Sequence, residues 1–277
     1  MKLGTVTDGL HVVWDSQRQK PTLGGALVLR QEAELLADAQ RHADIFVHGV
    51  WDQFAQQIFS SSAIRFRHSS DPAPSDTWPM KSSETEFSYF SFTRLVSLHQ
   101  ATGAIPRLKW KRSSQEIAIC VRRRFSGKLV CVHLKNVYPY NLIESNADKA
   151  PWVTFFHRHA KEGKLNFLLL GDDSLPDGMP LSNGVSRAVD LGLDLATQLA
   201  LIVYADGFLG MASGICTAAN FSATPHVIFK HPAHHADEMR KELGDADKFP
   251  FATDVQRLWR RTVSVHALDE ALALVMQ

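Results

Sequence analysis

The chain has 277 residues, of which 45% are hydrophobic and 21% are charged, a composition that excludes a disordered chain and permits a large buried core. At about 150 residues per domain, this length corresponds to one large domain or two modest ones. The 30 basic residues nearly balance the 29 acidic ones, which argues against nucleic acid as a partner, because nucleic-acid-binding proteins usually carry a clear basic excess.

The start of the chain predicts a βαβ unit. Residues 10–14 (LHVVW) and 44–48 (DIFVH) have the apolar character of short strands, and residues 26–42 between them place apolar side chains at helical spacing. A polar loop ending in Gly24-Gly25 precedes the helix. This loop is a candidate cradle for an anion or a sugar, and the alternative is a simple turn.

A long polar segment follows the βαβ unit. Residues 60–91 are rich in Ser, Pro and Asp, which predicts a loop. Helical spacing precedes it at residues 51–59 and follows it at residues 92–101.

Residues 107–128 form a basic run with eight Lys or Arg residues and a single acidic one. We place the domain boundary here, which predicts an N-terminal lobe at residues 1–125 and a C-terminal lobe at residues 126–277. The simplest interpretation of the run is a solvated or interdomain face. Contact with a membrane surface, an anionic acceptor or RNA remains an open alternative.

The second half alternates between strands and helices. The predicted strands are residues 129–134 (LVCVHL), 165–170 (LNFLLL), 207–209, 226–229 (HVIF) and 262–265, and the predicted helices are residues 147–162, 194–204, 213–221 and 268–275. Strands that are apolar on both faces belong to parallel sheets covered by helices. The fold class is therefore α/β, with a mostly parallel sheet in the C-terminal lobe.

A helix start near residue 213 is a candidate anion site. A short strand leads into Gly210, and Ser213-Gly214 open a helix whose first turn carries Thr217. The first amide groups of a helix lack internal partners, and small residues let a phosphate approach them. The alternative is structural, with Ser213 as a helix cap and Gly210 in a turn.

Other polar residues follow the predicted strands of this half. His133 and Lys135 come at the end of LVCVHL, and Asp172 and Asp173 follow LNFLLL. Ligands of open α/β sheets bind outside the carboxyl ends of the strands. Lys135 can neutralise a phosphate, and the two carboxylates can bind ribose hydroxyls or cap a loop.

The order of these motifs resembles a known family. HLK after one strand, LLLGDD after the next and then DLATQLALIVYADGFLGMASGICTAANFSATPHVIF are similar to the nucleotide-sugar-binding half of GT-B-fold glycosyltransferases, in particular the fucosyltransferase-like and heptosyltransferase-like groups. The resemblance covers residues 129–230, and residues 10–48 (with TLGGAL) only loosely. It implies two Rossmann-like lobes, of which the N-terminal one is reduced.

The resemblance also implies a reaction. A sugar would pass from a nucleoside-diphosphate sugar to a glycan, lipid-linked or small-molecule acceptor. Lys135 and the helix start at Ser213 would face the donor diphosphate. Asp15 and His48 are the candidate bases for the acceptor hydroxyl, with Asp15 preferred. The fold usually needs no metal, and no cofactor beyond the donor is implied.

Two rival functions remain open. One is a non-catalytic module that binds a nucleotide or a glycan on the same fold. The other is a sugar-nucleotide epimerase, which would need paired acid and base groups that we do not find. The histidine cluster at residues 231–235 matches no zinc-binding pattern, so we assign no metal ligands.

The number and positions of the cysteines indicate the cellular compartment of the protein. Cys120, Cys131 and Cys216 are odd in number and lie in apolar stretches, so we expect buried free thiols in a reducing compartment. The chain opens with no signal-like segment, and its longest apolar run is far shorter than the ~20 residues of a membrane helix. The sequence therefore predicts a cytoplasmic protein, with peripheral contact to the inner face of a membrane as the alternative that the basic run leaves open.

Overall fold

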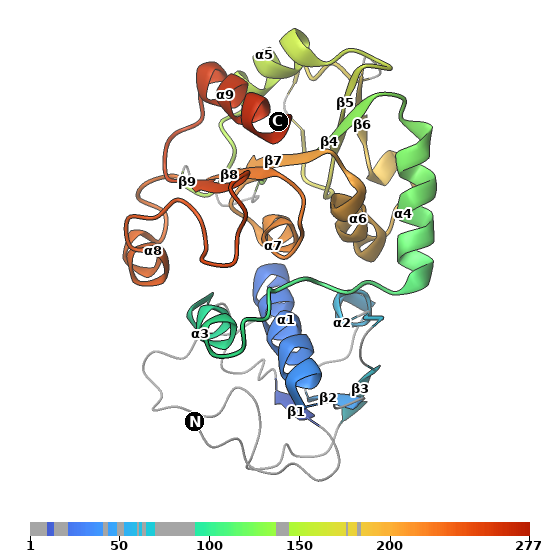
Figure 1. Cartoon of the computed structure of the whole chain (residues 1–277). Helices are drawn as coiled ribbons and strands as arrows, with labels where there is room; N and C mark the ends of the chain where they lie inside the picture. Colours follow the sequence, from blue (N-terminus) through green and yellow to red (C-terminus); the bar gives the residue numbers. More distant parts are fainter. Residues whose placement is uncertain are drawn as a thin grey trace. The chain divides into compact units, whose positions relative to one another are not determined.

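The chain divides into two compact units, Met1–Arg112 and Ser113–Gln277. The structure, a computed structural model (Figure 1), describes residues 10–13, 22–40, 44–48, 53–59, 61–62, 65–69, 92–136, 144–175, 177–181 and 184–277.

The second unit is built on a parallel sheet. In its described part, six strands pair in the order β6-β5-β4-β7-β8-β9, and every pairing is parallel. The chain winds from β4 through β5 to β6 in one direction and from β7 through β8 to β9 in the other, which is the strand order of a Rossmann sheet. The strands are β4 (Lys128–His133), β5 (Leu165–Leu169), β6 (Val185–Arg187), β7 (Gly207–Met211), β8 (His226–Phe229) and β9 (Gln256–Trp259).

Helices cover both faces of this sheet. Figure 1 shows α5 and α9 on one face and α6 and α7 on the other. This two-sided cover explains why β4 and β5 read as continuous apolar runs. The helices are α4 (Arg112–Arg124), α5 (Lys149–His159), α6 (Leu195–Leu201), α7 (Gly214–Asn220), α8 (Ala236–Leu243) and α9 (Val265–Val275), with 3-10 turns at Val189–Leu191 and Ile202–Tyr204.

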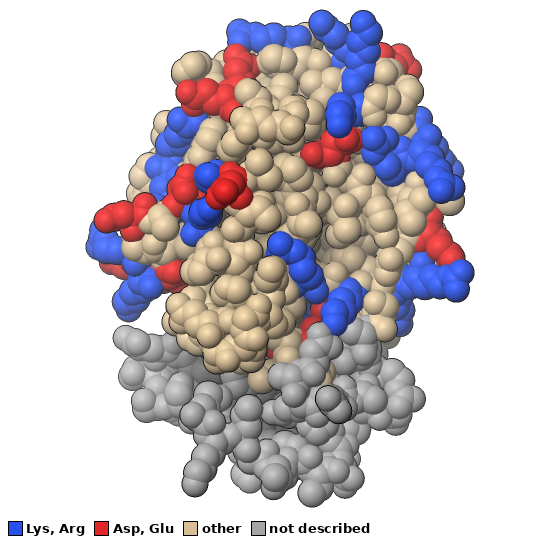
Figure 2. Space-filling view, viewed as in Figure 1, with Lys and Arg blue, Asp and Glu red and all other residues tan. Residues whose placement is uncertain are grey.

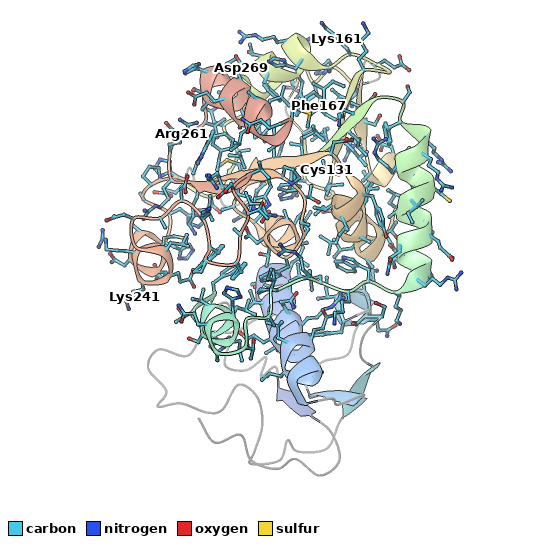
Figure 3. The ribbon with its side chains drawn as sticks, in the orientation of Figure 1. Cys131, Lys161, Phe167, Lys241, Arg261 and Asp269 are labelled. Carbon is cyan, nitrogen blue, oxygen red and sulfur yellow. The ribbon has the colours of Figure 1, made fainter. Side chains whose placement is uncertain are left out.

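An aromatic core lies between the sheet and helices α5 and α9. Trp152 and Phe156 of α5 are fully buried, and the Phe156 ring lies 5.1 Å from that of Phe167 on β5. At the surface, Asp269 of α9 lies 2.7 Å from His159 of α5. Figure 3 shows Phe167 at the sheet and Asp269 on α9. These contacts fix the α5–α9 layer against the sheet.

The first unit also has a parallel sheet. Its described strands pair in the order β1-β2-β3, and the second of two parallel pairings places His48 beside Ser69. The elements are β1 (Leu10–Val13), α1 (Leu23–Gln40), β2 (Asp44–His48), α2 (Gln53–Ile58), β3 (Arg65–Ser69) and α3 (Phe92–Thr102).

Helix α1 carries a buried charge network. The Arg30 guanidinium is 0% exposed and donates to Glu34 (2.9 Å) and to the carbonyl oxygens of Ile58 (2.7 Å) and Lys109 (2.6 Å). It also lies over the ring of Trp110, 4.4 Å from the centroid. A buried charge must be paired, and here three segments of the first unit supply the partners.

The predicted α/β class, with a parallel sheet in the second half, is confirmed. The division of the chain differs from the predicted boundary at residue 125, because the structure separates the units after Arg112. Lys109 belongs to the first unit, because its carbonyl oxygen accepts a hydrogen bond from Arg30. Helix α4 packs on the second unit, where Arg122 forms an ion pair with Asp206 at 2.8 Å. The basic run is therefore split between the two units.

Two predicted elements were wrong in position. The last strand is β9, not residues 262–265, because Ser264 caps α9 by accepting a hydrogen bond from the Ala267 amide at 3.1 Å. Gly24-Gly25 do not precede the first helix but lie in the first turn of α1, where the Thr22 hydroxyl accepts from Gly25 N at 3.2 Å. Gly24 and Gly25 therefore do not form a loop before the helix, and residues 14–21 of the predicted cradle lie outside the described residues.

Two further expectations also need correction. The segment predicted as a loop at residues 60–91 contains strand β3. Cys131 and Cys216 are buried as predicted, but Cys120 is exposed. It lies on the outer face of the amphipathic helix α4, whose Ala118 and Val121 are buried.

None of the helices that the structure describes combines the length and the apolar content needed to span a membrane.

Candidate functional site

The strand order of the second unit defines where a ligand is expected to bind. Strands β4 and β7 are neighbours, with His133 beside Gly210, and the chain leaves them in opposite directions. In open α/β sheets, this reversal opens a crevice at the carboxyl ends of the two strands. We call this region the β4–β7 edge, and several of the residues predicted from the sequence meet there.

A hydrogen-bonded relay crosses the β4–β7 edge. His133 is 4% exposed; its Nε2 lies 3.1 Å from Asp173 Oδ2, and its Nδ1 lies 2.8 Å from Ser213 Oγ. A carboxylate only accepts, so in the neutral ring Nε2 carries the hydrogen and Nδ1 accepts from the Ser213 hydroxyl. The relay thus joins the last residue of β4 to side chains that follow β5 and β7.

Asp173 holds this relay in place. Its other carboxylate oxygen accepts from Asn136 N at 2.7 Å. Burial raises the pKa of Asp173, but the hydrogen bonds from His133 and Asn136 and the His133 charge outweigh burial, so the pKa lies below its ordinary value. Gly171 makes room for the pair: it has a φ of +88°, and a Cβ there would lie 3.1 Å from both His133 and Asp173.

Lys135 lies beside the relay and is half-buried. Burial lowers its pKa below the ordinary lysine value, and the neighbouring Cys216 and Asp173 only partly oppose this shift. Burial also raises the pKa of the Cys216 thiol to about 12, so this thiol is neutral at physiological pH. The Lys135 ammonium donates to the Ser145 hydroxyl. An anion at this edge would restore the solvation that burial removes.

The residues of the predicted helix start have structural partners. Ser213 caps α7 by accepting from Cys216 N at 3.3 Å. Thr217 is 2% exposed, and its hydroxyl donates to the carbonyl of Ser213. Gly210 permits close strand packing, since a Cβ would lie 2.9 Å from His133 O. Thr217 and Gly210 therefore offer no free donor, and Gly214 begins a helix of only seven residues.

The remaining predicted residues are not part of this network. Asp172 is exposed beside Asp173. His48 ends β2 in the first unit, where only its backbone is described, and Asp15 lies outside the described residues. The roles of Asp15 and His48 as bases stay predictions.

One cation at the end of the neighbouring strand β8 is not among the predicted site residues. Lys230 directly follows β8, is only 7% exposed and is close enough to Lys135 for the two charges to repel. The signal was present in the sequence, because the lysine comes immediately after the buried strand HVIF. Its surroundings are described below.

The basic run is divided between the two units after Arg112. Its second half lies in and after α4, and Figure 2 shows Lys and Arg side chains on the side of the second unit where Figure 1 places that helix. Arg123 and Arg124 are exposed there, whereas Arg122 is bonded to Asp206. Membrane contact through this run stays a prediction.

Within the described part of the chain, no group of three or more His, Cys, Asp or Glu side chains is arranged to hold a metal ion.

Two solved structures have a similar fold. The glycosyl transferase family 9 protein from Veillonella parvula DSM 2008 aligns with a TM-score of 0.64 and 10% identity, over 100% of this chain and 98% of that one. Escherichia coli ADP-heptose LPS heptosyltransferase II aligns with a TM-score of 0.50 and 10% identity, over 97% and 99%. These likenesses show the fold. No protein-family model and no curated protein matches the sequence.

The comparison supports the predicted heptosyltransferase-like fold of the whole chain. The likeness to fucosyltransferase-like proteins stays a prediction.

Proposed function

We propose that the protein transfers a sugar from a nucleoside-diphosphate sugar to a glycan, lipid-linked or small-molecule acceptor. The observation that carries this proposal is the set of His133, Ser213 and Lys135 at the β4–β7 edge. This edge is where a Rossmann sheet receives its ligand. Support also comes from the fold, because both similar structures are named as glycosyltransferases.

The proposed reaction is a displacement at the anomeric carbon of the donor sugar. The bond from this carbon to the diphosphate oxygen breaks, a bond to the acceptor oxygen forms, and the acceptor proton passes to a base. Negative charge grows on the leaving diphosphate, so a cation at that position lowers the barrier. Lys135 supplies this charge, and Asp15 and His48 remain the proposed bases.

The relay has a positioning role in this scheme. Asp173 orients the His133 ring, and the ring fixes the Ser213 hydroxyl at the point where β7 meets α7. Because both oxygens of Asp173 accept hydrogen bonds from His133 and Asn136, we propose that it does not ligate a metal and that transfer is metal-independent. Asp172, which is exposed beside it, is the proposed contact to a ribose hydroxyl.

The proposed compartment is the cytoplasm. The three cysteines are free thiols, which is typical of proteins in a reducing environment.

A panel of nucleoside diphosphates tests donor binding. Thermal unfolding is measured with UDP, GDP, CDP and ADP, and we expect one of them to raise the midpoint. A ligand at 100 times its dissociation constant stabilises the folded state by about 2.7 kcal/mol, which is readily detected. If none of the four changes the midpoint, nucleotide-sugar binding is excluded at this edge.

Turnover then separates the three candidate functions. The nucleotide sugar of the selected nucleotide is supplied with a labelled sugar, and we expect release of the diphosphate with transfer of the label to an acceptor or to water. Nucleotide binding without release would indicate a binding module. Inversion of a sugar carbon without an acceptor would indicate an epimerase.

A further inference from the structure

A second cationic cavity lies at the carboxyl ends of β8 and β9. Its volume is about 310 Å³. The lining contains lysine, arginine and histidine and no acidic residue: Lys230, His231, Pro232, His234, Ala236, Met239, Arg240 and Arg260. A concave, half-open surface with this composition favours an anion over a cation or an apolar group.

Lys230 is the central residue of this cavity. Its backbone N–H donates to Trp259 O at 2.9 Å and extends the β8–β9 ladder, so its position is set by the sheet. The side chain is buried, yet no hydrogen bond or ion pair joins its ammonium to any other residue that the structure describes. Burying a charge without a partner is costly, and proteins normally pair such a group. Among the described residues that line the cavity, none supplies such a partner.

Two neighbouring groups supply further donors. Arg260 directly follows β9, and the register of Phe229 beside Trp259 places it next to Lys230. One of its guanidinium N–H groups donates to Gly244 O at 2.9 Å. Among the described residues, no carboxylate forms an ion pair with this guanidinium. His231 Nδ1 accepts from Ala233 N at 3.2 Å, so in the neutral ring Nε2 carries a hydrogen.

We propose that this cavity binds a phosphate group, held by the Lys230 ammonium, the Arg260 guanidinium and the His231 Nε2–H. Three donors arranged around one space suit a tetrahedral oxyanion with several acceptor oxygens. The phosphate is either free inorganic phosphate or a phosphate carried by a substrate. In both cases the chemistry that the cavity recognises is the same.

The phosphate cavity is separate from the proposed diphosphate position. Lys135 follows β4 and Lys230 follows β8, and strand β7 lies between these strands. The proposal does not depend on glycosyl transfer, because it rests on a cavity that the transfer scheme does not use.

Charge around Lys230 predicts how binding depends on pH. Burial lowers the pKa of Lys230 to about 8, although Glu242 and Glu238 favour its charged form. Burial and the nearby Lys230 charge lower the pKa of His234 to about 4, so this imidazole is neutral at physiological pH. The charged and titratable groups that surround the ammonium are Lys135, His231, His234, His235, Glu238, Arg240, Glu242 and Arg260.

The sign of the pH dependence follows from the ammonium. An anion binds the protonated amine, so affinity is highest below pH about 8 and falls by up to about tenfold per pH unit above it. Sulfate is the suitable probe for this measurement, because its own charge does not change over this range. This titration needs no variant, so it remains informative if a substitution alters folding.

Calorimetric titration with inorganic phosphate tests the site directly. We expect Lys230→Met to weaken binding by about 10- to 100-fold, the factor that loss of a hydrogen bond to a charged group brings. Lys161→Met is the matched control, because it removes an exposed ammonium in the turn before β5, and Figure 3 shows Lys161 at the end of the second unit near α5. Lys161→Met should retain wild-type phosphate affinity, and Lys135→Met should weaken phosphate binding less than Lys230→Met does.

Titration with a hexose phosphate distinguishes the two sources of the phosphate. A hexose phosphate that binds more tightly than inorganic phosphate, with the same loss in Lys230→Met, supports a substrate phosphate; equal affinities support free phosphate. Undiminished phosphate binding in Lys230→Met overturns the proposal, as does sulfate binding that does not weaken above pH about 8. An equal loss in Lys135→Met would assign the phosphate to the β4–β7 edge and also overturn the separate cavity, while leaving the proposed function intact.

Discussion

The charge network of α1 in the first unit and the relay at the β4–β7 edge of the second unit both place ionisable side chains inside the protein. Arg30 and Glu34 have side chains that are 0% and 1% exposed. His133 and Asp173 are 5% and 22% exposed, and half-buried Lys135 lies beside them. The first network is closed, and the second opens to solvent.

This difference separates structural charge from functional charge. The partners of Arg30 all belong to the chain, because it joins α1 to the end of α2 and to the segment before α4. At the β4–β7 edge, a half-buried ammonium borders a partly exposed carboxylate at the place where Rossmann sheets bind ligands. Removing a charge should therefore cost stability in the first unit and ligand affinity in the second.

Breaking the closed network should give the largest loss of stability. Arg30→Met leaves Glu34 buried without its cation, and we expect it to lower the free energy of unfolding of the first unit by about 3 to 5 kcal/mol. This change in the free energy of unfolding is measured by urea titration, with hydrogen exchange of the α1 amides as the probe of the first unit. The double variant Arg30→Met/Glu34→Gln should recover part of the loss, because no buried charge is then left unpaired.

A matched control is the more exposed pair of Arg187 and Asp190, whose charged atoms are 4.0 Å apart. Arg187→Met should change stability by at most about 1 kcal/mol, since such pairs contribute little. If Arg30→Met cost no more than this control, the closed network would not be a structural element of the first unit.

Opening the relay should have an intermediate effect. Asp173→Asn removes the charge that accepts from His133 and Asn136, and we expect a loss of about 1 to 2 kcal/mol at neutral pH. The folded-state pKa of Asp173 is depressed, so its contribution is present above the unfolded pKa and disappears as the pH falls through the lower folded value. Urea unfolding at neutral and at acidic pH should show a smaller difference between wild type and Asp173→Asn in acid. An undiminished difference would contradict the assigned ionisation.

The exposed end of α4 should show the smallest effect on stability. Arg123 and Arg124 are exposed in its last turn, and Arg123→Gln/Arg124→Gln should change the free energy of unfolding by no more than about 0.5 kcal/mol. The same variant tests the predicted membrane contact through sedimentation with anionic vesicles. We expect reduced vesicle binding, and unchanged binding would remove these residues from that contact.

Much of the second unit could be predicted from its apolar runs. LVCVHL, LNFLLL and HVIF are strands within one residue of their predicted ends, because strands covered on both faces leave a continuous apolar signal. Strand β3 (RFRHS) and strand β9 (QRLW) were missed, because short strands with charged residues leave no such run. Helix α4 was not predicted, because it lies within the basic run and its charged residues were not interpreted as part of a helix.

The candidate site was predictable where a polar residue ends an apolar strand. His133 and Asp173 were found by this rule, and Lys230 satisfies it too but was overlooked beside the histidines that follow it. The hydrogen bond between His133 and Ser213 could not be predicted, because it depends on β7 lying beside β4, where His133 faces Gly210, a residue 77 positions further along the chain. Strand order is a tertiary property, and it decides which strand ends meet.

The most direct test of the account compares how tightly two lysine variants bind one nucleoside diphosphate. This ligand is the one that raises the midpoint of thermal unfolding in the panel of four. Calorimetric titration of Lys135→Met should show binding about 10- to 100-fold weaker than wild type, while Lys161→Met binds as wild type does. Equal affinity of Lys135→Met and wild type, with both proteins folded, would contradict a diphosphate site at the β4–β7 edge.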